Sequence, residues 1–266
     1  MELKQYQRNV MTDLRRYLSI LEERHDLKDA FAAFWLEKSM PVGTGLRLAY
    51  QNLIPGVPNL CFKVPTGGGK TFMAACSIKP ILDSMPQLPY KVVVWLVPSD
   101  SIMEQTLRTL NDPDHPYRQQ LNQDYGHRVE VYTKDQATTG QNFSPAALRE
   151  QLSVLVLSYD SFRTSKADGR TAYRENGYLG PFENALGEVE KPIEGADMLS
   201  LYQIVNQLMP LVIVDESHHA RSPLSMQMLK DFNPCFVLDL TATPKNTSNV
   251  ISYVEAAQLK IENMVK

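Results

Sequence analysis

The feature that most constrains the fold is a glycine-rich segment, Val64-Pro65-Thr66-Gly67-Gly68-Gly69-Lys70-Thr71. It follows an apolar run at 60–62 and precedes a stretch, 72–85, that we expect to be helical. Consecutive glycines let the backbone turn its N–H groups inward, and the positive end of the next helix also attracts anions. We therefore predict a polyphosphate site, in which Lys70 reaches the β- and γ-phosphates and the Thr71 hydroxyl ligates Mg²⁺.

This segment departs from the strict phosphate-loop pattern G-x-x-x-x-G-K-[ST] at one position, because Val64 stands where the pattern has glycine. The remaining positions still supply the parts that surround a phosphate: Pro65, Thr66, Gly67, Gly68, Gly69, Lys70 and Thr71. The alternative interpretation is a glycine-rich surface turn with a chance lysine. The order strand, turn, helix favours the phosphate loop.

Composition and charge exclude several classes of protein. The 266 residues can bury one large core or two small ones, and the net charge of −3 gives no global basic field, so any nucleic-acid surface must be local. The three cysteines match no zinc or redox spacing and indicate reduced thiols in a cytoplasmic protein. No secretory signal and no apolar run of about 20 residues is present, so we expect no membrane partner.

Apolar strands alternate with helical stretches along most of the chain, at 91–97, 128–132, 153–158, 211–214 and 236–240. This alternation predicts an α/β fold of three layers with a mostly parallel central sheet. We expect an N-terminal helical region over 1–59, an α/β domain with the polyphosphate site over 60–266 and a final helix from about Val250. Within that domain, 163–195 reads as a surface insertion whose acids nearly balance its bases, although its mixture of basic and aromatic residues also suits single-stranded nucleic acid.

Two consecutive acids end the apolar strand at 211–214 and supply the second half of the phosphate chemistry. We expect Asp215 to hold Mg²⁺ through water, and Glu216 to orient or deprotonate the attacking water. His218 and His219 follow, but adjacent residues face different directions and no H-E-x-x-H pattern is present, which argues against zinc.

Three segments in this order resemble motifs I, II and III of DEAH-like superfamily 2 helicases: PTGGGKT at 65–71, DESH at 215–218 and TATP at 241–244. Two further segments extend the resemblance. Pro98-Ser99 with Gln105 is similar to motif Ia, which meets a nucleic-acid backbone, and Leu3 with Tyr6-Gln7 resembles the Q-motif, which makes Gln7 the implied adenine contact. The segment 157–162, LSYDSF, together with DESHH, resembles more narrowly the Res subunit of type III restriction enzymes.

The resemblance implies a RecA-like P-loop NTPase domain that binds ATP and Mg²⁺ and acts on DNA. Lys70, Asp215, Glu216 and His218 would be catalytic. Because strands of a parallel sheet end at one edge, His218 is expected to hydrogen-bond to the Thr241 or Thr243 hydroxyl and to couple ATP to DNA.

Such proteins also carry a second RecA-like domain and a nuclease domain, of which we find no sign in this sequence. No arginine-bearing motif VI is present, and the E-x-K triplet at 2–4 has no upstream acid. We expect the motor part of a longer protein, weakly active alone, since an arginine finger contributes about 10³–10⁵ in rate. Expected partners are those two domains, DNA and a modification methyltransferase subunit.

Three alternatives remain open: a nucleotide-sensing DNA-binding module without turnover, a fragment of another superfamily 2 repair helicase, and a small-molecule P-loop kinase. Glu216 argues against a sensor, which needs no water-activating acid. The TATP segment and the segment similar to motif Ia have no role in a kinase.

Overall fold

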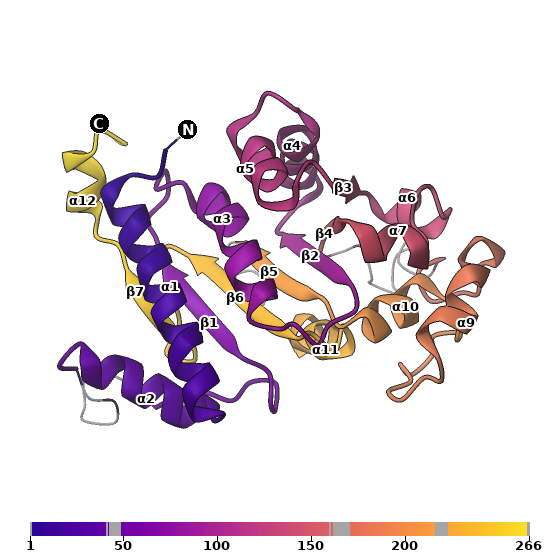
Figure 1. The fold of residues 1–266 in the computed structure, drawn as a ribbon, viewed down its shortest axis with the longest axis horizontal. Coiled ribbons are helices and arrows are strands. Elements are labelled where there is room, and N and C mark those ends of the chain that lie inside the picture. The colour runs from indigo at the N-terminus through magenta and orange to yellow at the C-terminus, as the bar shows by residue number, and fades with distance from the viewer. Residues whose placement is uncertain are drawn as a thin grey trace.

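A parallel β-sheet runs through the centre of the computed structural model, which describes residues 2–40, 42, 49–159, 161, 171–215 and 223–264 (Figure 1). The described residues form seven strands in the spatial order β3-β4-β2-β5-β6-β1-β7, and every neighbouring pair is parallel. The strands are β1 (Asn59–Lys63), β2 (Lys91–Val97), β3 (Val129–Tyr132), β4 (Leu152–Ser158), β5 (Leu211–Asp215), β6 (Phe236–Thr241) and β7 (Val250–Tyr253).

Helices connect the strands and cover both faces of the sheet, as parallel crossover connections require. Their bounds are α1 (Gln5–Arg24), α2 (Leu27–Glu37), α3 (Lys70–Asp83), α4 (Asp100–Asn111), α5 (Pro116–Tyr125), α6 (Lys134–Thr138), α7 (Pro145–Glu150), the 3₁₀-helix η1 (Gly177–Phe182), α9 (Glu183–Leu186), α10 (Leu201–Leu208), α11 (Pro223–Asp231) and α12 (Ala256–Ile261).

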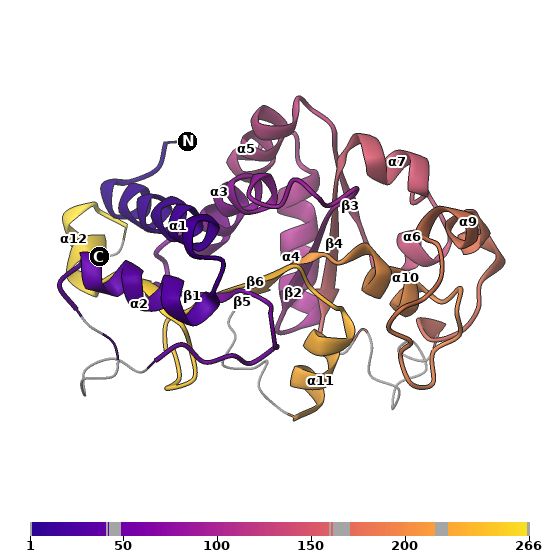
Figure 2. The same cartoon turned by 60° about the horizontal axis from the view of Figure 1, so that its bottom comes forward.

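Alternate residues of the central strands enter two separate cores, because successive side chains of a strand point to opposite faces. On β2, Val93 and Trp95 pack with residues of α1, α3, α4 and α5, whereas Val92 and Val94 pack with residues of α10 and α11. Figure 2 shows α3 and α11 on opposite sides of the strands. The predicted three-layer α/β fold with a parallel sheet is therefore confirmed.

The C-terminal part of the described chain differs from our expectation of a helix starting near Val250. Residues 250–253 form strand β7, which pairs with β1 at the edge of the sheet, and the helix α12 starts only at Ala256. Val250 and Ile251 are β-branched and buried beside β1, and such side chains suit a pleated sheet better than a short helix.

The described part of the expected surface insertion, 171–195, is anchored in the second core. Leu179 and Phe182 of η1 are 0% and 1% exposed. The centroid of the Phe182 ring lies 5.3 Å from that of the Phe143 ring. The insertion therefore contributes apolar side chains to the layer that contains α10.

The first turn of α1 lies beside α12, so segments from the two ends of the sequence meet (Figure 1). The backbone N–H of Gln5 donates to the Glu262 carboxylate at 2.8 Å. Among the described residues, no helix has both the length and the apolar character needed to cross a bilayer.

Candidate nucleotide site

The glycine-rich segment forms a tight turn between β1 and α3. Gly67 and Gly69 have φ angles of +79° and +73°, in the region that favours glycine. A Cβ on Gly68 would lie 2.6 Å from Cγ1 of Val64 and 3.0 Å from the carbonyl oxygen of Pro65. The loop therefore needs glycine at these positions, either for conformation or for space.

Lys70 and Thr71 occupy the first two positions of α3, directly after the loop. The first N–H groups of a helix have no partner within the helix and carry its positive end. Lys70 is 9% exposed, so its side chain lies mostly within the protein. Loop, helix start and lysine thus have the arrangement expected of a phosphate site.

Asp215 is the last residue of β5, at the same edge of the sheet as the loop. The order β5-β6-β1 puts one strand between them, and Asp215 pairs with Leu240 of that strand. Asp215 is 9% exposed. The sheet therefore brings the predicted magnesium ligand and the phosphate loop to one edge, where ligands of open α/β sheets bind.

Two tyrosines that the sequence did not single out as site residues lie near Asp215. The Tyr159 hydroxyl donates to the Asp215 carbonyl oxygen at 3.4 Å. The Tyr117 ring stacks on the Phe72 ring, with 5.4 Å between the ring centroids. The pKa of Tyr117 is raised mainly by burial and to a smaller extent by the Asp215 carboxylate. Both contacts depend on tertiary packing, so no local pattern in the sequence indicates them.

The TATP segment at 241–244 joins the glycine loop through the backbone of β6. Thr241 is fully buried, its carbonyl oxygen accepts from the Val64 N–H at 2.9 Å, and its hydroxyl accepts from the Thr243 N–H at 3.2 Å. Thr243 itself is exposed. The expected partner His218, like Glu216, lies outside the described residues, so the coupling contact stays a prediction.

The start of α1 also reaches the loop. Gln7 is 3% exposed; its Oε1 accepts from the Lys4 N–H at 2.9 Å and its Nε2 donates to the Gly68 carbonyl at 3.3 Å. The structure thus places Gln7 against the glycine loop. Its contact with adenine stays a prediction.

The residues similar to motif Ia lie at the start of α4, just after β2. Ser99 caps the helix by accepting from the Ile102 N–H at 3.4 Å. Ser99 and Gln105 are exposed and Pro98 is half-buried. Since β2 neighbours β5, this surface adjoins the edge that carries Asp215.

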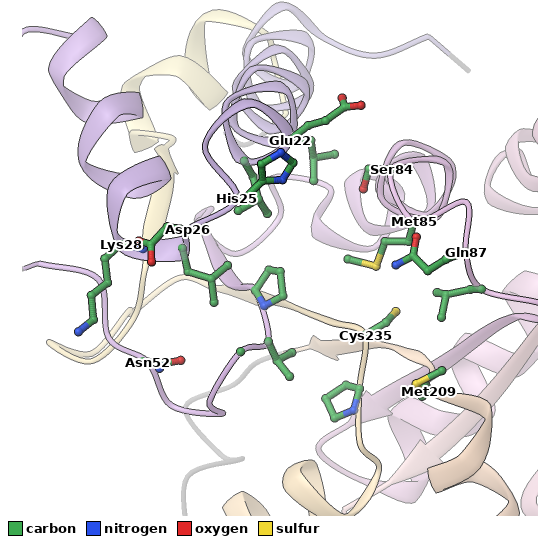
Figure 3. A pocket seen from close by; sticks show the side chains of 18 residues that line it. Glu22, His25, Asp26, Lys28, Asn52, Ser84, Met85, Gln87, Met209 and Cys235 are labelled. Carbon is green, nitrogen blue, oxygen red and sulfur yellow. Dashed lines mark hydrogen bonds between the residues drawn. The ribbon is translucent and has the colours of Figure 1, made fainter.

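A separate cavity of about 970 Å³ lies at the opposite edge of the sheet (Figure 3). It is lined by the ends of α1 and α3, the start of α2, and residues that precede strands, namely Pro58, Met209 and Cys235. His25 and Glu22 also line it. Because the glycine loop follows β1 whereas Pro58 precedes it, this cavity takes no part in the nucleotide site. Among the described residues, no cluster of three metal-ligating side chains is found.

Comparison with known proteins connects this geometry to a family. A family model described as "Type III restriction enzyme, res subunit" matches residues 1–246. The search of curated proteins finds no match.

A solved structure, that of "a nuclease-deletion mutant of the Type ISP restriction-modification enzyme LlaGI in complex with a DNA substrate mimic", has a similar fold. The TM-score is 0.50 at 14% identity, over 99% of this chain and 21% of that one. The likeness shows the fold, and this chain spans about a fifth of that protein's length.

Proposed function

Since the chain belongs to the family of type III restriction enzyme Res subunits, we propose that it is the ATP-binding motor domain of a DNA-dependent ATPase and translocase. Its family and its parallel sheet make this chain a helicase-like ATPase domain with a RecA-like fold. The nucleotide, the metal and the dependence on DNA are the proposal.

One observation carries the proposal: a glycine loop without room for a side chain opens directly into a helix that starts with Lys70. The Gly68 position excludes a Cβ on two sides, and Gly69 has a positive φ. Because the glycine positions of the loop carry no side chains, the backbone N–H groups can approach an anion closely. Asp215 at the same edge supplies the acid that a metal–phosphate complex needs.

The residues present fit a magnesium nucleotide. Thr71 and Asp215 would hold Mg²⁺, which neutralises charge on the phosphates when bound. Lys70 would contact the β- and γ-phosphates, with Pro65 to Gly69 around them. Glu216 would accept the proton of the attacking water, because a carboxylate that directly follows the metal-binding acid can serve as the general base.

DNA would contact the surface at the start of α4. Ser99 and Gln105 are exposed there, and hydroxyl and amide side chains together with helix N-termini commonly bind phosphate backbones. The solved structure with a similar fold belongs to an enzyme in complex with a DNA substrate mimic, which supports a DNA partner. A second RecA-like domain, a nuclease domain and a methyltransferase subunit are the further proposed partners, in the cytoplasm.

Calorimetric titration with ATP and Mg²⁺ tests the site. We expect Lys70→Ala to weaken binding at least tenfold, about 1.4 kcal/mol, because it removes a positive charge from the phosphate site. Lys79→Ala is the matched control, since Lys79 lies on the same helix but forms an exposed ion pair with Asp83 at 2.6 Å. Unchanged ATP affinity in Lys70→Ala would refute the nucleotide assignment.

The DNA dependence needs its own measurement. Phosphate release with and without duplex DNA should be compared in a longer protein that includes the second RecA-like domain. We expect DNA to stimulate hydrolysis. A DNA-independent rate would favour a different P-loop enzyme, and binding without hydrolysis would favour the sensor.

A further inference from the structure

The first turn of α1 holds one peptide group of the phosphate loop from the side. The Tyr6 hydroxyl donates to the Gly68 carbonyl oxygen at 2.9 Å, and the Gln7 amide donates to the same oxygen at 3.3 Å. Both side chains are 3% exposed. Two buried donors from a segment more than 60 positions away in the sequence therefore converge on one carbonyl.

This contact fixes the direction of the next N–H group. In a trans peptide the carbonyl oxygen and the following N–H point in opposite directions, and no described peptide bond is cis. With the Gly68 oxygen turned toward α1, the Gly69 N–H is turned away from it. The same contact keeps a partial negative charge from facing a bound polyphosphate.

The start of α1 is itself held in place by two further hydrogen bonds. The Gln7 Oε1 accepts from the Lys4 N–H at 2.9 Å, and the Gln5 N–H is bonded to Glu262 beyond α12. A Cβ on Gly69 would lie 2.5 Å from the Gln7 Nε2, so the loop and α1 approach as closely as glycine permits.

The hydroxyl of Tyr6 remains a donor at neutral pH. The pKa of Tyr6 is raised above its ordinary value, mainly by burial and to a smaller extent by the Glu262 carboxylate. A protonated hydroxyl donates to a carbonyl, whereas a phenolate would repel it.

We propose that Tyr6 is a positioning residue for the phosphate loop, whose hydroxyl presets the Gly68–Gly69 peptide so that the Gly69 N–H faces the phosphates of the nucleotide. This inference rests on the proposed function. It differs from an adenine-reading role for Gln7, because a preset loop benefits every polyphosphate ligand equally.

The test compares two tyrosines of one helix. Tyr6→Phe removes only the hydroxyl that reaches the loop. Tyr17→Phe is the matched control, because Tyr17 is also buried on α1 and its hydroxyl has no hydrogen-bond partner among the described residues. Binding of ATP, GTP and inorganic tripolyphosphate, each with Mg²⁺, is measured by calorimetry beside the thermal midpoint.

We expect Tyr6→Phe to weaken the binding of all three ligands by about fivefold, the effect of one lost hydrogen bond, and Tyr17→Phe to change none of them. Unchanged affinities in Tyr6→Phe would overturn the proposal. A loss confined to ATP would overturn it too, because Tyr6 would then act through adenine recognition.

Amide hydrogen exchange separates this inference from the proposed function. Exchange in the loop peptides at 66–71 should rise in Tyr6→Phe and stay constant in Tyr17→Phe, with no ligand present. If the unchanged protein bound none of the three ligands, the proposed function would fail, and the exchange rates would still decide whether Tyr6 holds the loop. Equal exchange in both variants would refute it.

Discussion

The backbone N–H of Val64 donates to the carbonyl oxygen of Thr241 at 2.9 Å. This bond extends the β1–β6 ladder by one step beyond the pair Lys63 and Thr241. Val64 is the first residue of the phosphate loop, and Thr241 begins the TATP segment. A shift of either segment therefore acts on the other directly through the backbone.

Coupling between these segments gives the first prediction. We expect His218→Ala to spare nucleotide binding but to uncouple translocation from hydrolysis, because His218 is predicted to bond to the hydroxyl of Thr241 or Thr243. DNA displacement should be measured beside phosphate release in the two-domain protein. Thr241→Val is an informative companion, since it keeps the side-chain volume and removes the hydroxyl that accepts from the Thr243 N–H. Equal loss of both activities, or loss of neither, would show that His218 is not a coupling residue.

Gly68→Ala tests whether the loop is as crowded as its geometry indicates. The new methyl group would lie 2.6 Å from Val64 and 3.0 Å from a backbone oxygen, so we expect a loss of about 1–3 kcal/mol in the free energy of unfolding. Nucleotide affinity should fall as well, because the loop must move. Gly177→Ala is the control, as its added Cβ would meet nothing within 4 Å. Chemical denaturation measures the first effect and calorimetry the second; equal stability in both variants would contradict the crowding.

The glycine-rich turn between β1 and α3 and the parallel sheet could be predicted because their signals are local. Glycines with a following lysine, and apolar runs of strand length, mark them in the sequence. Strand β7 could not be recognised in the same way, because its four residues become a strand only through pairing with β1 at the sheet edge.

The sequence contains the start and stop signals of helix α5. Pro116 stands at the first helical position and Gly126 ends the helix in the left-handed conformation. This helix brings Tyr117 to Phe72 and close to Asp215. The site residues contributed by packing, such as Tyr117 and Tyr159, depend on where whole elements lie, which a single sequence does not encode locally.

The raised pKa values of two thiols predict a fall in stability at alkaline pH. Burial raises the pKa of Cys76 to about 12, with the Asp124 carboxylate a smaller cause, and burial also raises that of Cys235 to about 12. An unfolded thiol ionises near pH 8.5. The folded state therefore binds the proton more tightly, so this stability is complete below about pH 8.5 and is lost as the pH rises toward 12.

The expected slope is up to about 1.4 kcal/mol per pH unit for each thiol. Tyrosines with raised pKa also lower the stability as the pH rises. The contribution of Cys76 is therefore measured as the difference in stability between the unchanged protein and a variant that lacks the thiol. Urea unfolding of Cys76→Ala and of the unchanged protein should be compared between pH 8 and 10. The variant should lose less stability over this interval; parallel curves would mean that Cys76 ionises equally in both states.

The last prediction separates the two acids at the end of β5. Asp215 is a buried strand residue, and Glu216 is the next residue in the sequence. Glu216→Gln keeps the shape but cannot accept the proton of the attacking water, so we expect ATP affinity to persist while hydrolysis in the two-domain protein is abolished. Asp215→Asn should instead raise the Mg²⁺ concentration needed for tight ATP binding, because it removes a charge from the metal site. ATP titrations at several Mg²⁺ concentrations, beside phosphate release, distinguish these effects. If Glu216→Gln weakened ATP binding in parallel with hydrolysis, Glu216 would hold the metal and the roles of the two acids would be exchanged.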